Sequence, residues 1–168
     1  MMLDNNFGSI VGLDPSLVLH RYAKSRLGGE FHPVLGVAEN LPFRNGSFAG
    51  IITCFSLRDV QDKTSSLHEF ARVLERKGRL EIVDVGKPDN LFARRLAGLY
   101  IAIEMPIIAR FLIGGRLREN PFRMIVPTFQ WLMTNHRLAQ LVGRVFGSSK
   151  LHEFLFGGLV VIEGERTK

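Results

Sequence analysis

Short apolar runs recur along the first half of the chain. They occupy residues 9–13, 33–38, 50–57 and 79–85. The run at 50–57, GIITCFSL, is continuous and rich in β-branched residues, which is typical of a strand covered on both faces. All four runs are therefore interpreted as buried strands.

Stretches with helical periodicity separate these runs. A first helix is predicted to start with Pro15 at its first position and to end at Gly28-Gly29. A second is predicted to be capped by Asp62 or Thr64. The apolar positions at helical spacing are Val18, Leu19, Tyr22, Ala23 and Leu27 in the first helix, and Leu67, Phe70, Ala71 and Leu74 in the second. Strands that alternate with helices in this way predict a mostly parallel α/β sheet.

The pattern changes in the second half of the chain. Residues 90–113 are strongly apolar and helical in character, whereas residues 114–134 show no period. A helix is predicted from Asn135, and two apolar runs around Gly157-Gly158 predict a terminal antiparallel pair. We therefore expect a single domain over residues 1–168, in which residues 90–134 form a helical and aromatic cover.

The apolar stretch at 91–113 is long enough to suggest a membrane span. Arg94, Arg95, Glu104 and Arg110 argue against a span, because charged side chains are costly inside a bilayer. Two interpretations remain. The stretch forms buried lid helices, or it lies on the membrane surface and gives access to a lipid-like acceptor.

Composition narrows the class of protein further. The chain has 168 residues, of which 46% are hydrophobic and 23% charged, and this is typical of a globular domain. Its net charge of +6 favours anionic partners or an anionic membrane surface, but no basic patch with interleaved aromatic residues indicates nucleic-acid binding. The single Cys54 suits a reducing, cytoplasmic compartment, and the dispersed histidines predict no metal site.

Asp14 is the first candidate for chemistry. It ends the run at 9–13 and precedes Pro15, so it is interpreted either as a helix cap or as a carboxylate at the carboxyl end of a strand. In the second role it accepts hydrogen bonds from both hydroxyls of a nucleotide ribose. The two roles are compatible, because one carboxylate has several acceptor positions.

Five segments occur in an order that is informative as a set. They read VGLDPS, VLGVAENLPF, GSFAGIITCFSLRDV, EFARVLERKGRLEIVDVGKP and GGLVVIEGE. In this order and at this spacing they resemble the class I S-adenosylmethionine-dependent methyltransferases, and most of all the ubiquinone/menaquinone C-methyltransferase group. The resemblance implies a Rossmann-like sheet, S-adenosylmethionine as cofactor, and methyl transfer to a prenylated quinone or another lipophilic acceptor.

The same resemblance implies roles for individual residues. Asp14 corresponds to the acid that holds the ribose. Val37, Ala38 and Glu39 correspond to the strand end that brackets the adenine. The residues that face the methionine part and the acceptor correspond to Cys54, Phe55, Ser56, Leu57 and Arg58. From the residues alone, Phe122, Phe129 and Trp131 either line an acceptor pocket or belong to the core, and no residue is predicted as the catalytic base.

Several departures from the family pattern bear on function. Val37 stands where the family usually has an acid, Ala49 replaces another acid, and no glycine-rich loop follows a first strand upstream of residue 9. In the family that first strand is central, between the second and the fourth. We therefore expect a sheet that lacks its first βα unit and that is completed by homodimerisation or by a partner chain. The alternatives to an enzyme are a non-catalytic methyltransferase-like scaffold and a peripheral lipid-binding module built on residues 91–131.

Overall fold

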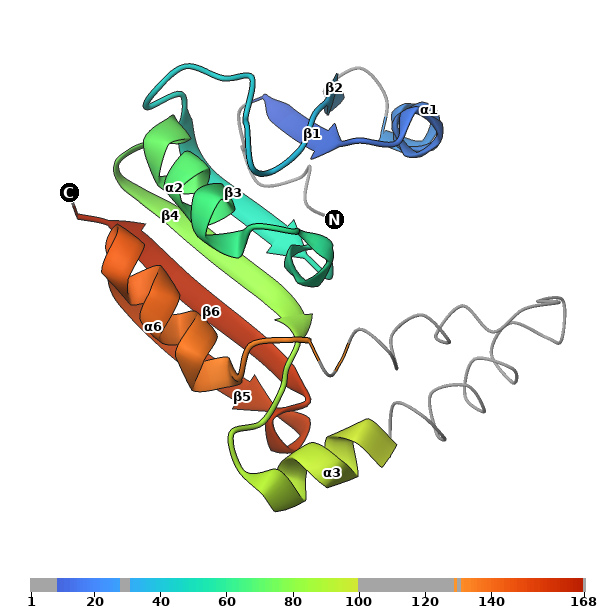
Figure 1. Ribbon diagram of the computed structural model, residues 1–168. Coiled ribbons are helices and arrows are strands. Elements are labelled where there is room, and N and C mark those ends of the chain that lie inside the picture. The colour runs from blue at the N-terminus through green and yellow to red at the C-terminus, as the bar shows by residue number, and fades with distance from the viewer. Residues whose placement is uncertain (1–8, 28–30, 100–128, 130, 168) are drawn as a thin grey trace, which may run out of the picture.

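The computed structural model describes residues 9–27, 31–99, 129 and 131–167 (Figure 1). The strands are β1 (Ile10–Asp14), β2 (Phe31–Leu35), β3 (Phe48–Cys54), β4 (Leu74–Val85), β5 (Gly147–Phe154) and β6 (Leu159–Arg166). The α-helices are α1 (Leu17–Leu27), α2 (Lys63–Val73), α3 (Leu91–Leu99) and α6 (Asn135–Phe146), and the short 3₁₀ turns are η2 (Leu57–Asp59) and η5 (Leu155–Gly157).

The strands form two sheets. β1 and β2 pair in parallel, and a second sheet has the order β3-β4-β6-β5. In that sheet β3 and β4 are parallel, whereas β4–β6 and β6–β5 are antiparallel. This arrangement confirms the expected α/β class and the C-terminal antiparallel pair.

The first sheet, β1-β2, is separate from the second sheet in the described part of the chain. It falls between β1 and β3, where the resemblance to methyltransferases places the family's first strand (Figure 1). Within the described part of the chain β1 pairs only with β2, and β3 only with β4. Each therefore keeps one unpaired edge.

The core lies between the four-stranded sheet and the pair α2 and α6. Alternate residues of β4, including Leu80 and Ile82, are buried against these helices, whereas Arg79 and Glu81 point to the other face and are exposed. The buried apolar cluster consists of Leu41, Leu57, Leu67, Phe70, Val73, Leu74, Leu80, Ile82, Ala139, Val142, Phe146 and Ile162. This cluster fixes the second sheet as the stable body of the fold.

Two helix starts differ from those predicted. α1 begins at Leu17 and not at Pro15, because Ser16 accepts the backbone N–H of Leu19 on its Oγ and so acts as the cap. α6 begins at Asn135 itself, after Thr134. The predicted cap Asp62 is confirmed, since its side chain accepts the N–H groups of Thr64 and Ser65.

The prediction that the apolar side chains of the first helix and of the third strand are buried is wrong for several described residues. Val18 on α1 is 74% exposed and Ile52 on β3 is 55% exposed, although both belong to patterns that predict burial. For Ile52 the reason is that α2 and α6 cover only one face of the second sheet. Val18 lies on α1, of which only His20 is buried. Most of the expected cover, residues 100–128 and 130, lies outside the described residues. Among the helices that are described, none is both long and apolar enough to cross a membrane.

Candidate functional site

The carboxyl ends of β1, β3 and β4 carry the candidate residues. Ligands of open α/β sheets bind at this edge of the parallel strands. Asp14 ends β1, Cys54 ends β3, and Asp84 lies one residue before the end of β4. The loop after β2 adds Val37, Ala38 and Glu39, so most of the residues expected from the sequence belong to one edge of the fold.

Asp14 has a local role and spare acceptor capacity. Its Oδ1 accepts the N–H of Ser16 at 2.7 Å, which holds the turn into α1. Its backbone oxygen lies 2.8 Å from Nε2 of the buried His20, so that nitrogen must carry the proton. The second carboxylate oxygen receives no hydrogen bond from the residues that the structure describes. Asp14 is therefore not the helix cap, and it can still accept a ribose hydroxyl.

The loop after β2 presents an apolar and an acidic side chain. Val37 is exposed and bridges to Asn40, while Ala38 packs against the main core. The Oε1 atom of Glu39 accepts the N–H groups of Gln61 and Asp62 at 3.0 and 3.3 Å. Glu39 therefore ties this loop to the start of α2 and keeps its second oxygen for another donor.

Arg72 and Glu69 of α2, here called the clamp, hold the residues that follow Glu39 in this loop. The Arg72 guanidinium donates to the carbonyl oxygens of Leu41 and Phe43 at 2.9 and 2.8 Å, and it forms a two-point pair with the Glu69 carboxylate. Glu69 in turn accepts the N–H of Leu41. The hydrogen bonds from Arg72 lower the pKa of the Glu69 carboxyl. The clamp thus fixes the loop that positions Val37 and Glu39.

The end of β3 is shaped by an uncommon backbone conformation. Phe55 has a φ of +53°, in the left-handed region that non-glycine residues rarely adopt, and its side chain is exposed. Its N–H still donates to Val83 of β4 at 2.8 Å, and the hydroxyls of Thr53 and Ser56 lie 2.8 Å apart. The chain therefore turns sharply out of the sheet at Phe55, and such strain is concentrated at functional sites.

Asp84 is a residue that the sequence analysis missed. It is buried, and its two oxygens accept the N–H groups of Arg58 and Val85 at 3.0 and 2.7 Å. Burial raises the pKa of the Asp84 carboxyl above its ordinary value, and these N–H groups oppose that rise. Asp84 lines a small pocket together with Leu57, Arg58, Lys63, Leu138 and Val160. It therefore positions the loop that contains Arg58.

The raised pKa predicts a pH-dependent stability. Between the ordinary value of 3.8 and the higher folded value, the folded protein binds more protons than the unfolded chain, so the free energy of unfolding falls as pH rises through this window. Asp84→Asn removes that component. Urea titrations of both proteins between about pH 4 and pH 7 should show wild type losing stability relative to the variant as pH rises. A constant difference would contradict the prediction.

Of the aromatic residues expected at the acceptor pocket, Phe129 and Trp131 belong to the described residues. Trp131 is 81% exposed in a turn and lines neither pocket described here, although its neighbours Leu132 and Met133 line the pocket at Asp84. Phe122 lies outside the described residues. Arg58, the other expected acceptor residue, contacts Asp59 through its Nε at 3.3 Å.

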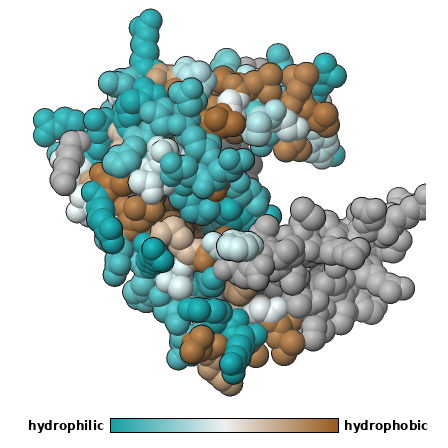
Figure 2. Space-filling model, in the orientation of Figure 1, coloured by the Kyte–Doolittle hydropathy of each residue, from teal (hydrophilic) through white to brown (hydrophobic). Residues whose placement is uncertain are grey.

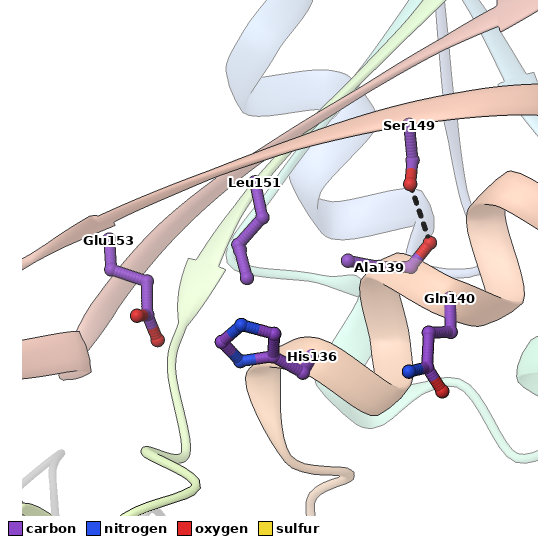
Figure 3. A pocket seen from close by; sticks show the side chains of 6 residues that line it. All are labelled: His136, Ala139, Gln140, Ser149, Leu151 and Glu153. Carbon is purple, nitrogen blue, oxygen red and sulfur yellow. Dashed lines mark hydrogen bonds between the residues drawn. The ribbon is translucent and has the colours of Figure 1, made fainter.

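A larger pocket of about 300 Å³ lies between α6 and β5 (Figure 3). Its lining includes His136 and Glu153, and Asp89 approaches both, so that one potential ligand atom of each lies within 4.8 Å of the others. The sequence did not indicate this cluster because its members are far apart in the chain. All three are exposed, and hydrogen bonds explain their convergence: Asp89 accepts from His136, and Glu153 accepts from Asn135. This pocket borders β5, which is the edge strand of the second sheet opposite β3. We therefore place the candidate functional site at the carboxyl ends of β1, β3 and β4 and not in this pocket.

Comparison with known proteins finds similarity to methyltransferases. The methyltransferase domain family matches residues 1–82. The demethylmenaquinone methyltransferase of Thermotoga maritima is 36% identical over 107 residues, which cover 62% of this chain and 46% of that enzyme. The ubiquinone/menaquinone biosynthesis C-methyltransferase of Geotalea daltonii is 26% identical over 165 residues, covering 94% of this chain and 68% of that enzyme. The chain is therefore similar to methyltransferases of quinone biosynthesis, and it spans about half the length of the first of these relatives.

Solved structures of methyltransferases share the fold of this chain. A methyltransferase of Thermotoga maritima, described as a possible histamine N-methyltransferase, has a TM-score of 0.63 at 19% identity and covers 95% of this chain and 73% of its own. A methyltransferase of Aquifex aeolicus has a TM-score of 0.60 at 12% identity, with 96% and 71% covered. Family and fold together imply S-adenosylmethionine as the cofactor.

The described residues of this chain fit one end of that cofactor. The second oxygen of Asp14 suits a ribose hydroxyl, and exposed Val37 can pack on an adenine ring but cannot accept a hydrogen bond from its amino group. No glycine-rich loop after a strand is found among the described residues to approach the methionine end. The fit of these described residues is therefore to the nucleoside part of the cofactor.

Proposed function

We propose that this chain is the nucleoside-binding and acceptor-binding part of a C-methyltransferase that acts on a prenylated quinol or a similar lipophilic ring. The observation that carries the proposal is the position of Asp14 at the carboxyl end of β1, of Glu39 in the loop after β2, and of Phe55 and Arg58 directly after β3. The curated relatives named above methylate demethylmenaquinone or act in ubiquinone and menaquinone biosynthesis, by their names. They support the quinone class of acceptor.

Exposed apolar surface supports a lipophilic acceptor. Leu91, Phe92, Leu96 and Leu99 of α3 are exposed, and so are Leu155 and Phe156 of η5, which packs beside α3. Figure 2 shows apolar groups at this lower end of the molecule. Leu155 and Phe156 both have positive φ values, 51° and 57°, so the backbone is held in an uncommon form that presents them to solvent. Such a surface suits contact with a prenyl chain or with the membrane that dissolves it.

The residues of this chain would act by binding and orientation. Bound S-adenosylmethionine supplies an electrophilic methyl group on its sulfonium. Asp14 would hold the ribose, and Asp84 would hold the loop from Phe55 to Arg58 so that the acceptor ring lies at a fixed distance and angle. Exclusion of water by apolar side chains would favour attack by the electron-rich ring carbon over hydrolysis.

Methyl transfer to a chosen set of acceptors tests this function. The chain is mixed with the segment of the Thermotoga maritima demethylmenaquinone methyltransferase that precedes its region of similarity to this chain, here named the Thermotoga fragment. Methyl-labelled S-adenosylmethionine is added with a reduced 2-polyprenyl-1,4-naphthoquinone, with the same ring lacking the prenyl chain, or with histamine. We expect label in the prenylated ring and little in the other two acceptors.

A matched pair of variants links the activity to Asp14. Asp14→Asn keeps the acceptor for Ser16 but loses the carboxylate, and we expect about a tenfold or larger rise in KM for S-adenosylmethionine, because hydrogen bonds to charged groups contribute about 1.5–3 kcal/mol. Asp59→Asn, an exposed carboxylate at the same edge, is the control and should change little. If the Thermotoga fragment binds but no label reaches any acceptor, the non-catalytic alternative replaces the enzyme.

A further inference from the structure

Three potential metal ligands meet beside the pocket between α6 and β5. Asp89 lies between β4 and α3, His136 in the first turn of α6, and Glu153 near the end of β5. One ligand atom of each residue lies within 4.8 Å of the other two. Figure 3 shows the Glu153 carboxylate and the His136 imidazole at the same end of the pocket. Three segments that are distant in the chain therefore contribute to one cluster, although the sequence predicted no metal site.

Hydrogen bonds hold both acids of this cluster in place. Oδ2 of Asp89 accepts the backbone N–H of His136 at 3.1 Å and lies 2.9 Å from its ring Nδ1. Oε1 of Glu153 accepts a hydrogen bond from Nδ2 of Asn135 at 2.6 Å, and the Asn135 side chain is itself buried. Outer contacts of this kind orient the side chains that bind metals in proteins. The ligand atoms are therefore positioned by the fold itself.

The charges within the cluster do not balance. Two carboxylates approach one imidazole, and no lysine or arginine of the described residues forms an ion pair with either acid. A single imidazole carries at most one positive charge, so two ionised carboxylates leave the cluster without a positive net charge at any protonation state of the ring. A divalent cation would offset both carboxylates, and it would replace the hydrogen that joins Nδ1 of His136 to Oδ2 of Asp89.

The pocket gives room for an ion and its water. It has a volume of about 300 Å³, and beyond His136 and Glu153 it is lined by Ala139, Gln140, Ser149 and Leu151. Three protein ligands are the usual number at a zinc site that keeps one position for water. One imidazole nitrogen with two carboxylate oxygens suits a first-row divalent metal, whereas Ca²⁺ takes six to eight oxygen ligands.

We propose that Asp89, His136 and Glu153 bind a first-row divalent metal ion such as Zn²⁺, through one oxygen of each carboxylate and Nδ1 of the imidazole. Asp89 and His136 flank residues 90–134 in the sequence, and Glu153 belongs to β5. The ion therefore ties both flanks of that stretch to the second sheet and stabilises the folded chain by binding to it. This role does not depend on methyl transfer.

Calorimetric titration of the untagged chain with ZnCl₂, without cofactor or acceptor, tests the site. We expect one Zn²⁺ per chain. Glu153→Gln keeps an acceptor for Asn135, and Asp89→Asn keeps one for His136, but each loses a carboxylate. Each variant should bind Zn²⁺ about tenfold or more weakly, because loss of even an outer contact of a metal ligand typically weakens binding by roughly 10–100-fold.

The chain offers matched controls for these variants. Nε2 of His152 lies 3.3 Å from the Glu163 carboxylate, and both side chains are exposed, but this pair belongs to no three-ligand cluster in the described part of the chain. Glu163→Gln should therefore bind Zn²⁺ as wild type does. Cys54→Ser should do the same, and it tests the exposed thiol, which is another type of zinc ligand.

NMR of the histidine ring nitrogens identifies the site without any substitution. Zn²⁺ should shift the Nδ1 resonance of His136 and leave the ring of His152 unchanged, and it should raise the urea midpoint of wild type but not of Glu153→Gln. Absence of binding at about 1 mM Zn²⁺ would overturn the proposal. Equal weakening by Glu153→Gln and Glu163→Gln, loss of binding in Cys54→Ser, or Ca²⁺ binding as tight as that of Zn²⁺ would also overturn it.

Discussion

Replacing Asn135 with alanine will lower the free energy of unfolding by about 2–4 kcal/mol, because buried polar groups left without partners cost about 1–3 kcal/mol each. The Asn135 side chain is buried at the start of α6. Its Oδ1 accepts the N–H of Lys87 at 2.6 Å, and its Nδ2 donates to the carbonyl of Gly157 at 2.9 Å and to Glu153 at 2.6 Å. It therefore joins the segment after β4 to η5.

Urea unfolding followed by circular dichroism measures this effect, with Gln140→Ala as the control. Gln140 lies on an exposed position of the same helix, so its replacement should change stability by no more than about 0.5 kcal/mol. Asn135→Asp should also destabilise, because it places a carboxylate against the acceptor oxygens of Glu153 and Gly157. Equal midpoints for Asn135→Ala and Gln140→Ala would show that the three contacts contribute nothing.

Arg72→Met should lower the free energy of unfolding by about 2–3 kcal/mol, since it removes charge-assisted hydrogen bonds and leaves Glu69 and two loop carbonyls without their donor. Arg72→Lys should recover only part of this, because an ammonium lacks the planar fork that reaches Glu69 with two nitrogens. Exchange at the Leu41 amide should rise in both variants.

Arg44→Met is the matched control for the clamp. Arg44 lies in the same loop and is exposed, so the same loss of charge should change stability by no more than about 0.5 kcal/mol. If Arg44→Met and Arg72→Met unfold at the same urea concentration, net charge and not the clamp accounts for the effect.

Local patterns predicted the elements well. The alternation of apolar runs and helical periods located β1 to β4, α1 and α2, and the diglycine located the β5–β6 pair. Asp62 was predicted as a cap because capping depends on neighbours in sequence. The family resemblance placed Asp14 and the residues around Phe55 at strand ends.

What the sequence did not indicate depends on long-range contacts. Arg72 bonds to carbonyls 29 and 31 residues away, and Asn135 joins segments on either side of it in the chain. Neither has a periodic signature. Ile52 was predicted to be covered because a continuous apolar strand is usually buried on both faces, but sequence pattern does not say which element supplies the cover.

The unequal burial of the two sheets has a consequence for ligand affinity. All described apolar side chains that are buried belong to residues 41–162. In contrast, β1, α1 and β2 bury only His20, and they pack against the main core through the partly buried Leu13. Segments with so few buried contacts open at a low free-energy cost. Asp14 therefore lies in the described part of the molecule with the fewest buried residues, and we expect this part to open at a lower free-energy cost than the main core does. A cofactor that needs Asp14 in place binds with an intrinsic affinity reduced by the fraction of molecules in which this part is ordered, and anything that raises the ordered population tightens binding without touching the cofactor.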